Sequence, residues 1–274
     1  MNDIDEIEHS QIRAILGSHP YFSDGNFLDI HTFADLPASA GMGSSSSFTV
    51  GMLNNLYLMN NVYKTAESLS IEAINIERNI LKEAGGWQDQ IFAAYGGFNR
   101  IDFFNDTFTV TPIVLSPETL SALEASCMLF FTNKLRSSKD VQDKLLKSDD
   151  SKRIYSLNEI KEYVDQAYSI LIKSTSPGNM VQEFGMLLNK TWESKKNLVE
   201  GTSNEDIDHI YQLGMDAGAY GGKLCGAGGG GFILFIVAKD KQEAVANVLQ
   251  DYHSIKIRFE NYGSRPIYSK MFTN

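Results

Sequence analysis

Apolar residues recur along the chain with two different spacings, and each spacing predicts a type of element. A repeat of three to four residues over 4–17 predicts a first helix, and alternation over 27–34 predicts a strand. Residues 48–59 form a second apolar helical stripe, directly behind a glycine- and serine-rich loop at 37–47. The order strand, loop, helix is therefore the main feature of the N-terminal part of the chain.

The rest of the chain mixes helical and strand-like patterns. Helices are predicted over 70–84, 87–95, 139–147, 157–174, 179–199, 206–219 and 242–252. Strands are predicted over 98–104, 108–114, 127–132, 232–238 and 254–259. Because these elements do not follow a regular βαβ alternation, the pattern predicts an α+β fold. A change in the pattern of apolar and polar residues near Leu115 predicts two domains, over residues 1–115 and 116–274.

Composition limits the function classes. The 274 residues are 43% hydrophobic and 21% charged, as in a soluble globular protein. A net charge of −10 argues against nucleic-acid partners but permits a local nucleotide pocket. The apolar run at 232–238 is too short to cross a bilayer, so no membrane partner is expected. Two isolated cysteines and an acidic N-terminus predict a cytoplasmic protein.

The loop at 37–47 is the strongest chemical signal. Gly41 and Gly43 allow positive φ and close backbone approach, and serines follow at the start of a helix. A helix N-terminus carries about half a positive charge and unpaired N–H donors, which suits a phosphate. The loop is not the usual P-loop, because no lysine follows its second glycine. It is not the dinucleotide-binding fingerprint either, because the third glycine and the acidic residue of that motif are missing. A serine-capped helix after a flexible turn explains the same residues.

Two acids follow the loop. Glu77 lies within an apolar helical stripe, where a carboxylate is costly unless it is paired or binds a metal. Asp89 comes 89 − 77 = 12 positions later, just beyond Gly85 and Gly86. One helix could thus offer a metal ligand and the next a base. The alternatives are an ion pair for Glu77 and an N-terminal capping role for Asp89.

A second glycine run, at 226–231, lies between a predicted helix and the buried strand at 232–238. Side chains are absent there, so the backbone is expected to pass close either to a ligand or to another backbone. Lys134, Arg136 and the pair Lys195–Lys196 are candidate contacts for an anionic substrate, or solvated surface charges.

These features resemble the motifs of the GHMP kinase superfamily. Residues 37–46, Pro-Ala-Ser-Ala-Gly-Met-Gly-Ser-Ser-Ser, are similar to its phosphate loop, Pro-Xaa-Xaa-Xaa-Gly-Leu-Gly-Ser-Ser-Ala. Residues 223–231 resemble its C-terminal glycine motif. Segments at 76–78, 88–90, 95–99 and 191–196 look like the branch that contains the D-glycero-D-manno-heptose 7-phosphate kinases. The similarity extends from about residue 5 to the end.

The resemblance implies a fold and a site. The fold would be an incomplete N-terminal domain like ribosomal protein S5 domain 2, followed by a ferredoxin-like domain. ATP would be the phosphoryl donor, and its phosphates would contact Pro37, Gly41, Gly43, Ser44, Ser45 and Ser46. Mg²⁺ would be held by Ser45 and Glu77. Asp89 would accept or orient the proton of the acceptor hydroxyl. Substrate and phosphate would be enclosed by Gly226, Gly228 and Gly229, with Gln90, Thr132 and Arg136 as further substrate contacts.

The implied activity is ATP-dependent phosphorylation of the anomeric hydroxyl of a heptose 7-phosphate, for bacterial surface-polysaccharide precursors. The partner would be this sugar phosphate, and a homodimer is a candidate assembly. Family members carry strands and a Gly-Gly-Gly-Thr-Asp-like segment upstream of the loop, which is expected to be missing here because the loop begins at Pro37. The alternatives are a shortened, non-catalytic nucleotide-binding remnant and a fucose-type or mevalonate-type kinase.

Overall fold

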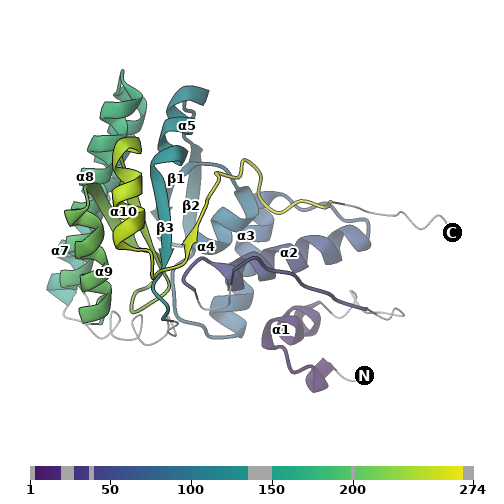
Figure 1. Ribbon diagram of the computed structural model, residues 1–274. Helices are drawn as coiled ribbons and strands as arrows, with labels where there is room; N and C mark the ends of the chain where they lie inside the picture. The colour runs from purple at the N-terminus through teal and green to yellow at the C-terminus, as the bar shows by residue number, and fades with distance from the viewer. Residues whose placement is uncertain (1–3, 20–27, 37–39, 135–149, 199–200, 268–274) are drawn as a thin grey trace. The chain divides into compact units, whose positions relative to one another are not determined.

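The computed structural model describes residues 4–19, 28–36, 40–134, 150–198 and 201–267 (Figure 1). These residues form two compact units. The first unit takes the described residues of 1–38, 43–97 and 260–274, and the second takes those of 39–42 and 98–259. The domain boundary predicted near Leu115 stays a prediction.

The first unit is built from helices. They are η1 (Ile4–Glu6), α1 (Ser10–Ser18), α2 (Ser44–Met59), α3 (Ala66–Ile74), the π-helix η3 (Asn75–Ile80) and α4 (Gln88–Tyr95). Their core includes Ile15, Leu53 and Ile76, which have no exposed surface. Thr65 begins α3 by accepting a hydrogen bond from the N–H of Ser68, which satisfies one of the helix's free donors.

The second unit contains a four-stranded antiparallel sheet. Its strands are β3 (Cys127–Phe131), β4 (Ala219–Leu224), β5 (Phe232–Val237) and β6 (Ser254–Ile255), in the order β4-β5-β3-β6. This is the strand order of a ferredoxin-like sheet, and it confirms the α+β prediction. A separate hairpin joins β1 (Asn99–Phe104) to β2 (Thr107–Pro112), with Phe103 opposite Phe108.

Helices cover the sheet. They are α5 (Pro117–Ser126), α7 (Asp150–Lys173), α8 (Pro177–Leu198), α9 (Glu205–Asp216) and α10 (Gln242–Val248), with the 3-10 turn η4 (Lys239–Lys241) before α10. Figure 1 shows α8, α9 and α10 running alongside the sheet. Successive side chains of β5 enter different clusters, because strand side chains alternate between faces. Phe235 and Val237 pack with Ile207 of α9, whereas Ile236 packs with Leu123 of α5. Burial on both faces explains the continuous apolar run.

Several predicted elements differ from the structure in the first unit. Over the described residues 28–34 the chain pairs with no strand, because an alternating segment becomes a strand only beside a neighbour that shares its hydrogen bonds. The helix predicted over 70–84 ends as the π-helix η3, and Lys82 beyond it has a left-handed φ of 56°.

The second unit also departs from the predictions. Helix α5 was not predicted, although Ser116 caps it and Pro117 occupies its first turn. Gly221 and Gly222, which directly follow the helix predicted over 206–219, lie inside β4. The helix predicted over 139–147 lies outside the described residues. In the described part of the chain, no helix combines the length and apolar character needed to span a bilayer.

Candidate active site

The N-terminus of α2 presents backbone N–H groups beside a carboxylate. Gly43 precedes the helix with a φ of 69°, and among the described residues no side chain caps the helix there. A Cβ added to Gly43 would lie 3.5 Å from both Cβ and Cγ of Asp89. Glycine therefore suits the left-handed backbone, and Asp89 lies within ordinary contact distance of this position. The arrangement offers an anion the donors and dipole of a helix start, with an acid at its edge.

A buried carboxylate also contacts the start of α2. Glu77 belongs to the π-helix η3, in which the N–H of Leu81 donates to the carbonyl of Ile76 at 2.9 Å. Such π turns are rare and occur frequently at functional sites. The side chain of Glu77 is 1% exposed. Its Oε2 accepts hydrogen bonds from Ser46 Oγ at 3.0 Å and from Gln90 Nε2 at 2.5 Å. The carboxylate is thus held by α2 and α4 together.

One oxygen of this carboxylate has no partner. Oε1 of Glu77 and Oε1 of Gln90 are both buried, and neither accepts a hydrogen bond from any residue the structure describes. The guanidinium of Arg78 lies 3.7 Å from Oε2. Burial raises the pKa of Glu83, and the charge of Glu77 raises it further while Arg78 opposes this. At Glu83 the charge of Glu77 therefore has a larger effect on the pKa than that of Arg78.

These residues fit a magnesium ion. Mg²⁺ prefers hard oxygen ligands and usually takes one or two carboxylates, with waters and substrate phosphates completing its shell. The unpartnered Oε1 of Glu77 is such an oxygen. Within the described ranges there is no group of three or more His, Cys, Asp or Glu side chains that could hold a metal alone. A cation here would therefore take its remaining ligands from water and, when a nucleotide is bound, from its phosphates.

The loop serines have different partners. Ser46 is 3% exposed and donates to Glu77, whereas Ser45 is exposed and its Oγ accepts a hydrogen bond from Gln11 Nε2 of α1. Magnesium binding by Ser45 stays a prediction, and Ser46 is the serine in contact with the carboxylate. Sequence reasoning missed Gln11, because nothing marks one glutamine among the polar residues of a first helix.

Asp89 lies in the first turn of α4 and is exposed, in contrast to Glu77. Its Oδ1 accepts a hydrogen bond of 3.4 Å from Gln88 Nε2. The two acids thus have distinct environments, one enclosed and one open to solvent. Pro37 and Arg136, predicted as phosphate and substrate contacts, lie outside the described residues.

The glycine run of the second unit packs closely on backbone. Gly226 has a φ of 70°, and a Cβ there would lie 2.7 Å from Cα of Gly41. A Cβ at Gly228 would lie 2.9 Å from Cα and O of Thr202, and Gly229 N–H donates to the same carbonyl at 2.9 Å. Backbone contact accounts for these glycines, so their predicted role around a ligand stays a prediction.

Two further side chains meet this run. Thr132 is 4% exposed, and its Oγ1 donates to the carbonyl of Gly231 at 2.9 Å, a bond that fixes the loop. Lys195 Nζ donates to the carbonyl of Gly226 at 2.5 Å. Burial lowers the pKa of Lys195 to about 8, and repulsion by Lys223 contributes. Substrate contact by Thr132 stays a prediction.

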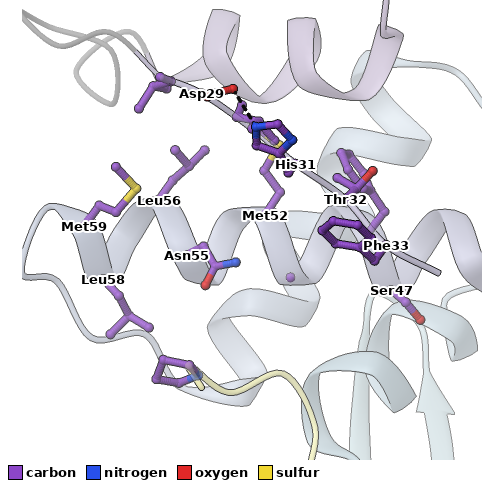
Figure 2. Close-up of a pocket in the computed structure, with 15 residues that line it drawn as sticks. Asp29, His31, Thr32, Phe33, Ser47, Met52, Asn55, Leu56, Leu58 and Met59 are labelled. Carbon is purple, nitrogen blue, oxygen red and sulfur yellow. Dashed lines mark ion pairs between the residues drawn. The ribbon is translucent and has the colours of Figure 1, made fainter. Parts of the chain in front are cut away.

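A groove of about 530 Å³ runs along α2 in the first unit (Figure 2). The segment at 28–33 forms one wall, and Ser47, Gly51 and Asn55 belong to the helix wall. The lining is mostly apolar, and an ion pair of 3.1 Å joins His31 Nε2 to Asp29 Oδ1 at its edge. Because Ser47 follows the loop serines directly, the groove begins at the N-terminus of α2.

Comparisons with known proteins agree with this arrangement. The model of the GHMP kinases N terminal domain matches residues 11–97, and that of the GHMP kinases C terminal region matches residues 178–255. The first match contains the loop serines, Glu77 and Asp89, and the second contains the glycine run.

Two similar proteins carry names of sugar kinases. A D-glycero-alpha-D-manno-heptose 7-phosphate kinase of Campylobacter jejuni is 35% identical over 225 residues, which cover 81% of this chain and 65% of that protein. A bifunctional fucokinase/GDP-fucose pyrophosphorylase of Arabidopsis thaliana is 28% identical over 88% of this chain and 23% of its own length. The chain thus spans less than two thirds of the length of these relatives.

The fold has a solved counterpart. The crystal structure of a D-glycero-D-manno-heptose 1-phosphate kinase from Bacteroides thetaiotaomicron matches with a TM-score of 0.69 and 27% identity, covering 95% of this chain and 74% of that one. With family models matching both parts of the chain, and the loop and acids placed as described, the chain belongs to the GHMP kinase superfamily.

Proposed function

We propose that the chain is an ATP-dependent kinase that phosphorylates a hydroxyl group of a sugar phosphate. The observation that carries this proposal is the meeting of three groups within the first unit. Residues 43–46 provide a helix N-terminus, Ser46 contacts the buried Glu77, and the exposed Asp89 lies where a Cβ on Gly43 would meet it at 3.5 Å. Phosphoryl transfer depends on positioning and charge neutralisation, and these groups can supply both.

Each group has a role in this proposal. The N–H groups at the start of α2 bind the phosphates of ATP. Glu77, with a hydroxyl from Ser45 or Ser46, would hold Mg²⁺, which supplies neutralisation of phosphate charge when bound. Asp89 accepts or orients the proton of the acceptor hydroxyl, because it is the acid that is exposed beside the helix start.

The acceptor proposed is a heptose 7-phosphate, phosphorylated at its anomeric hydroxyl for the synthesis of surface-polysaccharide precursors. Support comes from the Campylobacter jejuni and Bacteroides thetaiotaomicron kinases, whose names specify heptose phosphates. The Arabidopsis thaliana relative makes a fucose-type acceptor the first alternative to test.

The groove along α2 is the proposed site of the nucleoside part of ATP. It starts at Ser47, one residue after the loop serines, and its volume of about 530 Å³ lies within the range of small-molecule sites. Phe33, 95% exposed, offers an aromatic face at this groove, and Asn55 offers an amide. Apolar walls with a few polar groups suit a purine and its ribose.

An assay that couples ADP release to a readout tests the activity with a panel of sugars and sugar phosphates. In Asp89→Asn, kcat should fall about 10²- to 10⁴-fold while ATP affinity stays near that of the wild type, as expected for loss of a proton acceptor. Asp106→Asn, at the exposed tip of the hairpin, is the matched control. Equal loss of kcat and affinity would contradict the role of Asp89. Absence of turnover on every sugar, at high enzyme concentration, would refute the kinase proposal.

A non-catalytic nucleotide-binding protein is the second candidate, because the N–H groups at the start of α2 could bind phosphates whether or not Asp89 acts on a hydroxyl. Calorimetric titration with a non-hydrolysable ATP analogue separates the two candidates. Binding of the analogue without turnover of any sugar would favour the second.

A further inference from the structure

The contacts of Glu77 are distributed unequally over its two oxygens. Ser46 Oγ, Gln90 Nε2 and the distant guanidinium of Arg78 all face Oε2, at 3.0, 2.5 and 3.7 Å. In the part of the chain that the structure describes, no donor reaches the buried Oε1. A carboxylate held by one oxygen presents the other oxygen in a fixed direction.

We propose that Gln90 is a positioning residue for Glu77: its amide nitrogen fixes Oε2 so that Oε1 stays available to a divalent cation. The inference rests on the proposed function, because the cation is the Mg²⁺ of that proposal. It assigns Gln90 to the protein side of the cation site, in place of the substrate contact expected from the sequence.

Burial supports this role. Gln90 is 0% exposed, whereas Gln88, two positions earlier on the same helix, is exposed. A buried amide next to the buried Glu77 is placed to hold that carboxylate in one orientation. Ile91 and Ala94 are also buried, so α4 is anchored by its apolar face and carries Gln90 on a rigid element.

The chemistry of the buried atoms points to a cation as well. Both Glu77 Oε1 and Gln90 Oε1 are acceptors without a donor among the described residues. An unpaired buried acceptor is costly, and a buried carboxylate more so, unless a positive group completes its surroundings. Groups that orient a metal ligand typically change metal affinity by about 10- to 100-fold when they are removed.

Ser46 makes the second contact to Oε2 and sharpens the assignment. Its hydroxyl is held at the start of α2, so Glu77 is fixed from two helices. Loss of Gln90 removes the 2.5 Å contact and leaves Ser46, which cannot by itself prevent rotation of the carboxylate about its last torsion. Metal affinity should therefore fall without disappearing.

The test uses Mn²⁺ as the probe and the full chain without nucleotide. Binding is followed by loss of the free-ion signal in electron paramagnetic resonance. Gln90→Leu should raise the Kd for Mn²⁺ about 10- to 100-fold, and Gln88→Leu should leave it unchanged. Gln90→Asn, which keeps the amide but shortens its reach, should also raise the Kd, and it decides the question if Gln90→Leu does not fold.

The outcomes separate this inference from the function on which it rests. Wild-type protein that binds Mn²⁺ with the same Kd as folded Gln90→Leu and Gln90→Asn would overturn the positioning role alone. Wild-type protein that binds no Mn²⁺ would overturn the cation site, and this inference with it. A change in thermal midpoint with an unchanged Kd would show that Gln90 is a packing residue, which also overturns the proposal.

Discussion

Replacing Glu77 by glutamine should remove metal binding and leave stability nearly unchanged, whereas replacing it by leucine should also lower stability. In Glu77→Gln, the amide oxygen can occupy the position of Oε2 and keep the hydrogen bonds from Ser46 and Gln90. The amide nitrogen then stands where Oε1 has no partner. One unpaired buried group replaces another and a buried charge is removed, so the free energy of unfolding should change by no more than about 1 kcal/mol.

Glu77→Leu removes the acceptor and leaves both donors buried. Each unsatisfied donor costs about 1–3 kcal/mol, so the two together should lower the free energy of unfolding by about 2–6 kcal/mol. Urea unfolding followed by circular dichroism measures the difference. The hydrogen bonds predict that the free energy of unfolding decreases from wild type to Glu77→Gln to Glu77→Leu, and that only Glu77→Leu shows a large decrease.

Magnesium separates the variants in a second way. A ligand at 100 times its Kd stabilises a folded protein by about 2.7 kcal/mol. Wild-type protein should gain such an increment with Mg²⁺, whereas Glu77→Gln, which lacks the carboxylate charge, should gain almost none. If Glu77→Gln is as unstable as Glu77→Leu, the hydrogen bonds to Oε2 are misassigned. If it keeps the full magnesium increment, Glu77 is not the cation ligand.

Two further predictions test other parts of the chain. A Cβ added to Gly51 meets no atom within 4 Å. Gly51→Leu should therefore fill the groove and raise the KM for ATP about tenfold, or ~1.4 kcal/mol. Gly17 is equally open but lies outside the groove, so Gly17→Leu should leave the KM unchanged. An unchanged KM in Gly51→Leu would exclude the nucleoside from the groove. The pKa of Lys195, lowered to about 8 mainly by burial, means that the folded state binds fewer protons than the unfolded state between about pH 8 and 10.5. The contribution of this group to stability therefore rises with pH. In urea unfolding, the free energy of unfolding of Lys195→Met relative to wild type should be about 1 kcal/mol higher at pH 7 than at pH 9.5. A difference between the two proteins that does not change with pH would contradict the lowered pKa.

The parts of the site that follow from local sequence were predictable. A helix start behind glycines, and an acid just past a glycine break, need only neighbours along the chain. The partners of Glu77 were not predictable in this way. Its contact with Ser46 joins residues 31 positions apart, and the contact with Gln90 depends on the π-helix η3. A π turn changes the direction of the side chains within its helix, Glu77 among them, and no residue type in 75–80 marks it.

The fold shows the same division. Burial on both faces of β5 could be predicted from its unbroken apolar run, because such runs indicate a doubly covered strand. Strand β4 was missed because its glycines signal a turn. In the structure, a Cβ at Gly221 would lie 2.0 Å from the carbonyl oxygen of Gly185 in α8. Glycine is there to let a helix approach a strand, and that requirement arises only once the two elements meet.

This difference between glycines bears on how the motifs carry function. At Gly226 a Cβ would meet the backbone of Gly41 at 2.7 Å, so packing alone excludes other residues. At Gly43 the nearest atoms to an added Cβ are those of the Asp89 side chain, at 3.5 Å. A glycine that packs on backbone maintains the shape of a loop whether or not a ligand binds. A glycine that brings a helix N-terminus against an exposed carboxylate places opposite electrostatic partners beside open solvent, where a phosphate and a hydroxyl could react. The chemical inference therefore rests on Gly43, Glu77 and Asp89 rather than on the longer glycine run.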